Sequence, residues 1–130
     1  MSPDTLVLDQ PENEIKIHNG EQYRTCNYDQ SFAISKDYFN GNELAAKVFL
    51  DKYAVRDNEG NLVEPSPECM HVRMAIEFTR IEKKKFKDPI SYEEILSYFD
   101  YFKKIIPQGS ILYGLGNDFQ AISLSNCFVL

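Results

Sequence analysis

The sequence predicts a mainly helical protein of about three helices, with an extended N-terminal arm and a C-terminal β-strand. Three segments between residues 42 and 107 repeat apolar side chains at helical spacing. Residues 1–38 show only short alternation and several turn-forming residues, which favours an extended arm. The last residues alternate with the period of two that is typical of strands. We therefore expect an arm at 1–38, a helical region at 39–107, and a loop and strand at 108–130.

The first helix is expected from about Asn42 to Val55, after a start signal at Gly41 and Asn42. Its apolar residues form two rows at i,i+4 spacing, which are Leu44 with Val48, and Ala45 with Phe49 and Tyr53. Residues 57–61 combine Asp, Asn and Gly, and so predict a turn.

The second helix is expected to begin at Ser66. Serine is a good N-cap, Pro67 suits the first helical position, and Glu68 complements the positive end of the helix dipole. One face of this helix is apolar and consists of Met70, Met74, Phe78 and Ile81.

The third helix opens with a capping box, in which Ser91 precedes Glu94 by three positions. Pro107 is expected to end this helix, since proline cannot continue one. The expected buried stripe consists of Ile95, Phe99, Phe102 and Ile106.

The residues after Pro107 change in character. Residues 108–110 are Gln-Gly-Ser, and residues 114–118 contain two glycines, an asparagine and an aspartate, so both segments predict loops. The glycines of the second segment lack the third glycine of a phosphate-binding loop and do not open a helix, so a turn is expected. Residues 120–130 then predict a strand that carries Cys127 on its face of small and polar side chains. Because a strand needs neighbours for its backbone groups, we expect it to pair outside the 130 residues or with the N-terminal arm.

Charge and composition exclude several classes of function. The formal net charge is -6, whereas nucleic-acid binding needs a basic surface. The lysines of residues 83–87 are flanked by Glu82 and Asp88, so we interpret them as the solvated end of a helix. No apolar run approaches a membrane span, and no signal-peptide pattern opens the chain. We therefore expect a cytoplasmic protein with neither nucleic acid nor membrane as a partner.

The cysteines agree with a reducing compartment, because Cys26, Cys69 and Cys127 are odd in number and widely spaced. Cys69 and His71 could suggest a metal site. They lie two positions apart on a predicted helix and so point in different directions, and no further ligand is evident. We expect no metal there.

Four segments together resemble the adenosylcobalamin-dependent (class II) ribonucleotide reductases. Residues 41–57 resemble the family's opening helix, and Ser66–Pro67–Glu68 resembles its next element. Residues 106–110, Ile-Pro-Gln-Gly-Ser, resemble the substrate-side loop. Residues 124–130 read Leu-Ser-Asn-Cys-Phe-Val-Leu, similar to the Leu-Ser-small-Cys-Phe-Val-Leu pattern of the first barrel strand. The resemblance extends over about residues 40–130.

This resemblance implies the N-terminal portion of a ten-stranded α/β barrel, within the large (catalytic) subunit that reduces ribonucleotides to deoxyribonucleotides for DNA synthesis. Two cysteines on adjacent barrel strands supply the electrons in this family, and Cys127 matches the first by motif position. A thioredoxin-like dithiol would then reduce the resulting disulfide. Ser110 matches the loop position that touches the substrate diphosphate or ribose, and Asn126 would contribute backbone contacts to the substrate.

The family's radical cysteine, second reductant cysteine and cobalamin site lie beyond Leu130, so the resemblance implies a fragment that is inactive alone. Adenosylcobalamin is expected in the complete enzyme, and no cofactor is expected on this chain by itself. The partner would be the remaining barrel, encoded by the same gene or by a companion chain.

The residues leave other interpretations open. Cys127 could be a buried structural cysteine, as most free cysteines are, and Ser110 a loop-capping serine. Asn126 faces away from Cys127 in a strand, which weakens its case. The chain could also be a non-catalytic helical interaction module that assembles with a partner chain.

Overall fold

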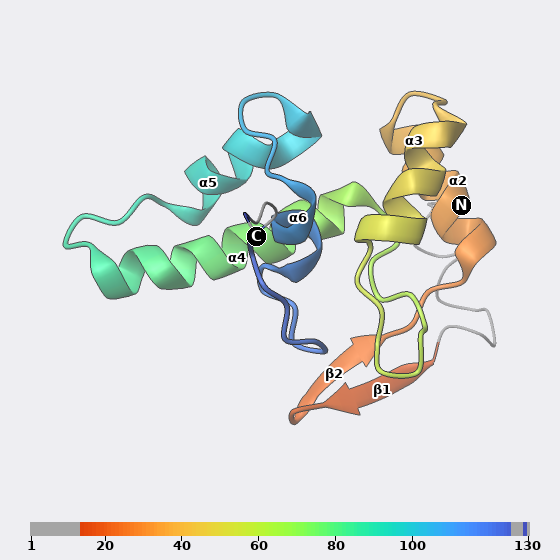
Figure 1. Ribbon diagram of the computed structural model, residues 1–130, viewed down its shortest axis with the longest axis horizontal. Helices are drawn as coiled ribbons and strands as arrows, with labels where there is room; N and C mark the ends of the chain where they lie inside the picture. Colours follow the sequence, from red (N-terminus) through yellow and green to blue (C-terminus); the bar gives the residue numbers. More distant parts are fainter. Residues whose placement is uncertain (1–13, 126–128, 130) are drawn as a thin grey trace. The chain divides into compact units, whose positions relative to one another are not determined.

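The computed structural model describes residues 14–125 and Val129 (Figure 1). The chain divides into two compact units, of which one runs to Pro67 and the other begins at Glu68. The boundaries expected after residues 38 and 107 stay predictions.

The first unit begins with a two-stranded antiparallel hairpin. Strand β1 (Ile15–His18) pairs with β2 (Glu21–Arg24), so that Ile15 faces Arg24 and His18 faces Glu21. Asn19 and Gly20 connect them with φ values of 51° and 82°. Two residues with positive φ match the twist of a hairpin, which is why Asn-Gly is favoured there. Strand β1 lies on one of the short alternating stretches within residues 1–38.

Helix α2 (Tyr28–Tyr38) corrects the expectation of an extended arm over these residues. The Asn27 side chain caps it by accepting a hydrogen bond from the Gln30 backbone N–H at 3.1 Å. Its buried face carries Ser31 and Ser35 in place of large apolar residues. The Ser35 hydroxyl donates to the Pro65 carbonyl at 2.9 Å. Apolar periodicity is weak in such a helix, because hydrogen bonds satisfy its buried hydroxyls.

The helix expected at 42–55 forms as two pieces. Helix α3 (Glu43–Val48) is capped by Asn42, and η1 (Phe49–Tyr53) continues it as a π-helix. Phe49 and Leu50 at the start of the π-helix are buried, whereas Leu44 in α3 is 73% exposed. The expected row of Leu44 with Val48 is therefore not the core-facing one.

The expected turn at 57–61 is present and is built around the buried carboxylate of Asp57. Its Oδ1 accepts hydrogen bonds from the backbone N–H groups of Glu59 and Asn61, each at 2.9 Å. These bonds satisfy a charge that would otherwise be costly to bury, and they lower the pKa of Asp57 although burial opposes this.

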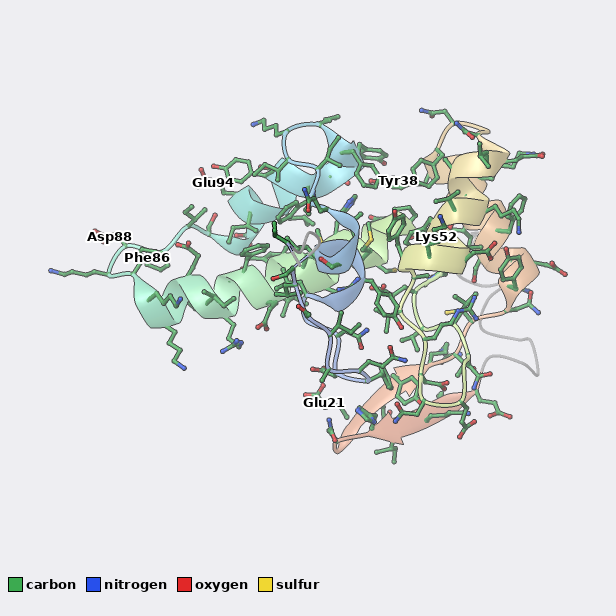
Figure 2. The ribbon with its side chains drawn as sticks, viewed as in Figure 1. Glu21, Tyr38, Lys52, Phe86, Asp88 and Glu94 are labelled. Carbon is green, nitrogen blue, oxygen red and sulfur yellow. The ribbon has the colours of Figure 1, made fainter. Side chains whose placement is uncertain are left out.

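The second unit is organised by α4 (Pro67–Lys85), which begins where the sequence predicts. Met70 and Met74 are buried, as expected, whereas Lys83, Lys84 and Lys85 end the helix in solvent. Figure 2 shows Phe86 and Asp88 in the connection that follows α4.

Helix α5 (Tyr92–Phe99) has the expected cap, since the Ser91 hydroxyl accepts a hydrogen bond from the Glu94 N–H at 3.2 Å. It ends earlier than expected. Residues 100–102 form a short 3-10 turn, η2 (Asp100–Phe102), in which Tyr101 and Phe102 have φ values of 51° and 55°. These left-handed residues redirect the chain before Pro107, and Ile106 is consequently 68% exposed. The expected stripe therefore stops short of Ile106.

The expected substrate-side loop contains a helix, α6 (Gly109–Gly114). Leu112 and Leu115 are buried at its C-terminal half, which supplies the contact that a six-residue helix needs. Residues 121–125 have no regular structure, so the strand expected at 120–130 is not formed in this part of the chain. A strand requires a hydrogen-bonded neighbour, and none pairs with these residues here. The remainder of that prediction falls on residues outside the described ones, apart from Val129.

Candidate functional site

The candidate site is α6 and the chain that follows it, because one predicted site residue lies on α6 and the other two follow this segment in the sequence. Ser110 is the second residue of α6 and is partly buried. Asn126 and Cys127 lie outside the described residues. The structure thus places one of the three predicted site residues and the segment that leads to the other two.

The chain after α6 folds back against that helix. A Cβ atom at Gly114 would lie 3.1 Å from Ile122 Cβ and 3.2 Å from Leu124 Cδ2. Glycine therefore favours this approach, since most real Cβ contacts are longer than these distances. The segment that leads to Asn126 and Cys127 starts in contact with the helix that carries Ser110.

The turn between α6 and this segment is held by the side chain of Asn117. Its Oδ1 accepts hydrogen bonds from the N–H groups of Phe119 at 2.9 Å and Gln120 at 3.2 Å. The Tyr113 hydroxyl also donates to Gln120 Oε1 at 2.9 Å. The glycine-rich segment is thus a turn, as expected, and its asparagine binds the N–H groups that a phosphate loop would present to a ligand.

Arg73 of α4 binds the C-terminal half of α6. Its Nη1 donates to the Leu115 carbonyl, and its Nη2 donates to the Leu112 carbonyl at 2.5 Å. Sequence reasoning did not single out Arg73. The signal was present, because Arg73 lies three positions after Met70 and therefore beside the buried stripe of its helix. A charged residue at such a position needs a partner.

His71 is fully buried and packs edge-on against Phe102, with 4.7 Å between ring centroids. Burial lowers its pKa to about 4; Asp100 raises the pKa and Arg73 lowers it. The imidazole is therefore neutral at pH 7. Cys69, two positions earlier, is exposed, so the two side chains do not converge. The described residues contain no group of three potential metal ligands from His, Cys, Asp and Glu.

A cavity of about 390 Å³ lies within the second unit. Apart from Glu82, the side chains that line it are apolar or aromatic, and Glu82 Oε2 already accepts a hydrogen bond from the Ile90 N–H at 3.1 Å. Phe78 and Phe99 stack in it with ring centroids 5.6 Å apart. The lining residues are Phe78, Glu82, Ile90, Ile95, Tyr98, Phe99, Ile105, Pro107 and Ile111.

This cavity does not fit adenosylcobalamin. The corrin is a large ring fringed with amides, which need several hydrogen-bonding partners when they are buried. The cavity offers apolar walls and one carboxylate that is already engaged. We therefore assign no cofactor role to this cavity. The described helices also include none that is long and apolar enough to cross a membrane.

Comparison with protein families gives a match to the family described as ribonucleotide reductase, all-alpha domain, over residues 39–119. The matched span begins just before α3 and ends after the Asn117 turn, so it includes Arg73 and Ser110. No curated protein and no solved structure gave a significant match. The family match covers more than half of the chain and agrees with its mainly helical structure. The chain therefore belongs to the ribonucleotide reductase family, and residues 39–119 correspond to its all-alpha domain.

Proposed function

We propose that this chain supplies part of the catalytic subunit of an adenosylcobalamin-dependent reductase, which converts ribonucleotides to deoxyribonucleotides for DNA synthesis. One observation carries the proposal: the match to the all-alpha domain ends at residue 119, and a segment with the order Leu-Ser-Asn-Cys-Phe-Val-Leu follows at 124–130. That order resembles the family's first barrel strand, which carries a reductant cysteine.

Cys127 is one of two reductant thiols in this proposal, and the remaining barrel supplies the second. The two thiols become a disulfide and release two electrons and two protons. The 2'-hydroxyl of the ribose leaves as water and a hydrogen takes its place. A thioredoxin-like dithiol then reduces the disulfide by thiol exchange, a reaction that proceeds through the thiolate. Adenosylcobalamin would bind to the remaining barrel, where it would supply the radical chemistry of the complete enzyme.

Ser110 and Asn126 contribute to the substrate pocket. A hydroxyl can donate to and accept from phosphate or ribose oxygens, and the backbone next to Cys127 would contact the same substrate. The contact of Gly114 with Ile122 and Leu124 supports this grouping, because it brings the chain toward Asn126 back onto the helix of Ser110. The location we propose is the cytoplasm, where the thiol pool is kept reduced.

Reconstitution tests the proposal. The chain is mixed with a polypeptide that carries the remaining barrel, together with adenosylcobalamin, a dithiol and a ribonucleotide, and deoxyribonucleotide is measured. Cys127→Ser is expected to abolish product, whereas Cys69→Ser is the matched control and should retain it, because Cys69 is an exposed thiol on α4.

The outcomes separate the alternatives. Product in the mixture that depends on Cys127 supports a reductase assembled from this chain and its partner. Association without Cys127-dependent product would overturn the catalytic role and leave a helical interaction module. Product that requires a second protein as the radical source, and not adenosylcobalamin, would overturn only the cofactor assignment.

A further inference from the structure

We propose that Arg73 is a positioning residue, which holds α6 in place and thereby fixes Ser110 and the start of the segment toward Cys127. The purpose of this positioning, which is to form part of a substrate site, rests on the proposed function. Its hold on α6 is a property of this chain and can be tested without the reaction.

Helix α6 lacks the local signals that would make it stable by itself. It has six residues, and its N-cap residue Gln108 makes no side-chain hydrogen bond to it. Isolated helices of this length are not stable in water, because the cost of nucleation exceeds the gain from so few hydrogen bonds. Contacts from other elements must therefore fix it.

Arg73 provides such a contact at the end of α6 where it is needed. The last carbonyls of a helix have no partner within the helix. Two nitrogens of the Arg73 guanidinium donate to two of these groups, the carbonyls of Leu112 and Leu115. The planar fork of arginine can bind two acceptors in a fixed geometry, which the single ammonium of lysine cannot reproduce. The pair of bonds therefore sets the orientation of α6 against α4 as well as its position.

The backbone after α6 approaches Arg73 just as closely. Gly116 has a φ of 72°, and a Cβ atom there would lie 3.2 Å from both Arg73 Cγ and the Arg73 carbonyl oxygen. A glycine at this point lets the chain turn back directly over the arginine. Arg73 thus lies close to both α6 and the turn that follows it, and both lead into the candidate site.

Loss of Arg73 should loosen α6 and the turn but leave α4 and α5 folded. Arg80 provides a matched control, because it lies two turns further along α4 and binds Glu77 at the surface through Nε at 3.0 Å and Nη2 at 2.6 Å. Arg73→Met and Arg80→Met remove the same group from the same helix. Arg73→Lys keeps the charge and loses the fork.

The first measurement is hydrogen exchange on the full chain. The amides of Ile111, Leu112 and Leu115 donate within or into α6. In Arg73→Met these amides should exchange about tenfold faster or more, the factor expected when one or two hydrogen bonds to charged groups are lost. The amide of Ile95 in α5 should be unchanged, and Arg80→Met should alter neither set. Unchanged exchange at residues 111–115 in Arg73→Met would overturn the inference.

The second measurement is turnover in the reconstituted mixture. A positioning role predicts a KM for the ribonucleotide at least about tenfold higher in Arg73→Met, an intermediate value in Arg73→Lys, and a value within about twofold of wild type in Arg80→Met. Millimolar guanidinium ion should restore part of the activity of Arg73→Ala, whereas ammonium should not. Wild-type kinetics in Arg73→Met would overturn the positioning role.

The two measurements also separate this inference from the proposed function. If the wild-type mixture makes no product while exchange quickens only at α6, Arg73 holds the helix and the reductase assignment fails. If the wild-type mixture makes product but Arg73→Met does not change hydrogen exchange at α6, the reductase assignment stands and the role of Arg73 fails.

Discussion

Helices α5 and α6 belong to the same unit but are stabilised in opposite ways. Helix α5 has its own N-cap in Ser91 and buries Ile95 and Phe99 along one face. Helix α6 has no side-chain cap and depends on the burial of Leu112 and on Arg73 from α4. A helix with local signals can be predicted from its own residues. A helix held by another element cannot, and this explains why residues 108–110 were expected to form a loop.

The contrast between α5 and α6 is tested most strongly by substitutions at the C-terminal end of α5. Phe99→Ala should lower the free energy of unfolding by about 4 kcal/mol, because Phe99 is buried and stacks on Phe78. Ile106→Ala should change it by no more than about 0.5 kcal/mol, since Ile106 is exposed. Urea unfolding measures both. Equal losses would mean that the buried stripe continues to Ile106, as the sequence alone had indicated.

Acid should weaken the contact between α4 and the turn after α5. The pKa of His71 is lowered to about 4 in the folded chain, from 6.5, mainly by burial. The unfolded chain therefore binds a proton first as the pH falls. Neutral His71 therefore contributes up to about 3 kcal/mol to the free energy of unfolding. This contribution is fully present above pH 6.5 and is lost as the pH falls from 6.5 to 4. Urea unfolding across this range should show a smaller loss in His71→Leu. The same pH dependence in both proteins would contradict the assignment.

Glycine substitutions should separate backbone strain from the contact with Arg73. Gly116→Ala should cost about 2 kcal/mol and Gly60→Ala about 1 kcal/mol, as both have positive φ but only Gly116 would bring a Cβ against Arg73. Thermal unfolding measures the difference. If the two substitutions lower stability equally, the close approach of the turn to Arg73 makes no measurable contribution to stability.

The smallest expected effects concern the caps. Ser91→Ala should destabilise α5 by about 1 kcal/mol, because the Glu94 N–H loses its acceptor. Gln108→Ser should stabilise α6 by up to about 1 kcal/mol, because it adds the cap that this helix lacks. Hydrogen exchange of the first-turn amides reports each change. A neutral Gln108→Ser variant would show that the contacts of α6 with other elements already fix its N-terminal end.

Much of the fold could be predicted wherever a signal and the structure it specifies lie close together in the sequence. Ser91 with Glu94, Ser66 with Pro67, and the turn around Asp57 act over a few residues, and each element begins where expected. Helix α2 was missed because its buried serines, Ser31 and Ser35, imitate an exposed face.

For the candidate site, the sequence supplied the residue types and a family resemblance, and the family match supports the coarser part of that prediction. The roles of Cys127, Asn126 and Ser110 remain predictions. The sequence pattern placed Ser110 in a loop, whereas the structure places it on a helix that packs against the segment toward Cys127.

By itself, the sequence determined where helices α4 and α5 begin, the turn around Asp57, and membership of the reductase family. Only the tertiary structure decided where α5 stops, that α6 exists, and that Arg73 lies over its last carbonyls. The reason is physical. A cap or a turn satisfies hydrogen bonds among neighbouring residues, whereas the hold of Arg73 on Leu112 and Leu115 joins groups about forty positions apart and exists only once α4 and α6 have packed together.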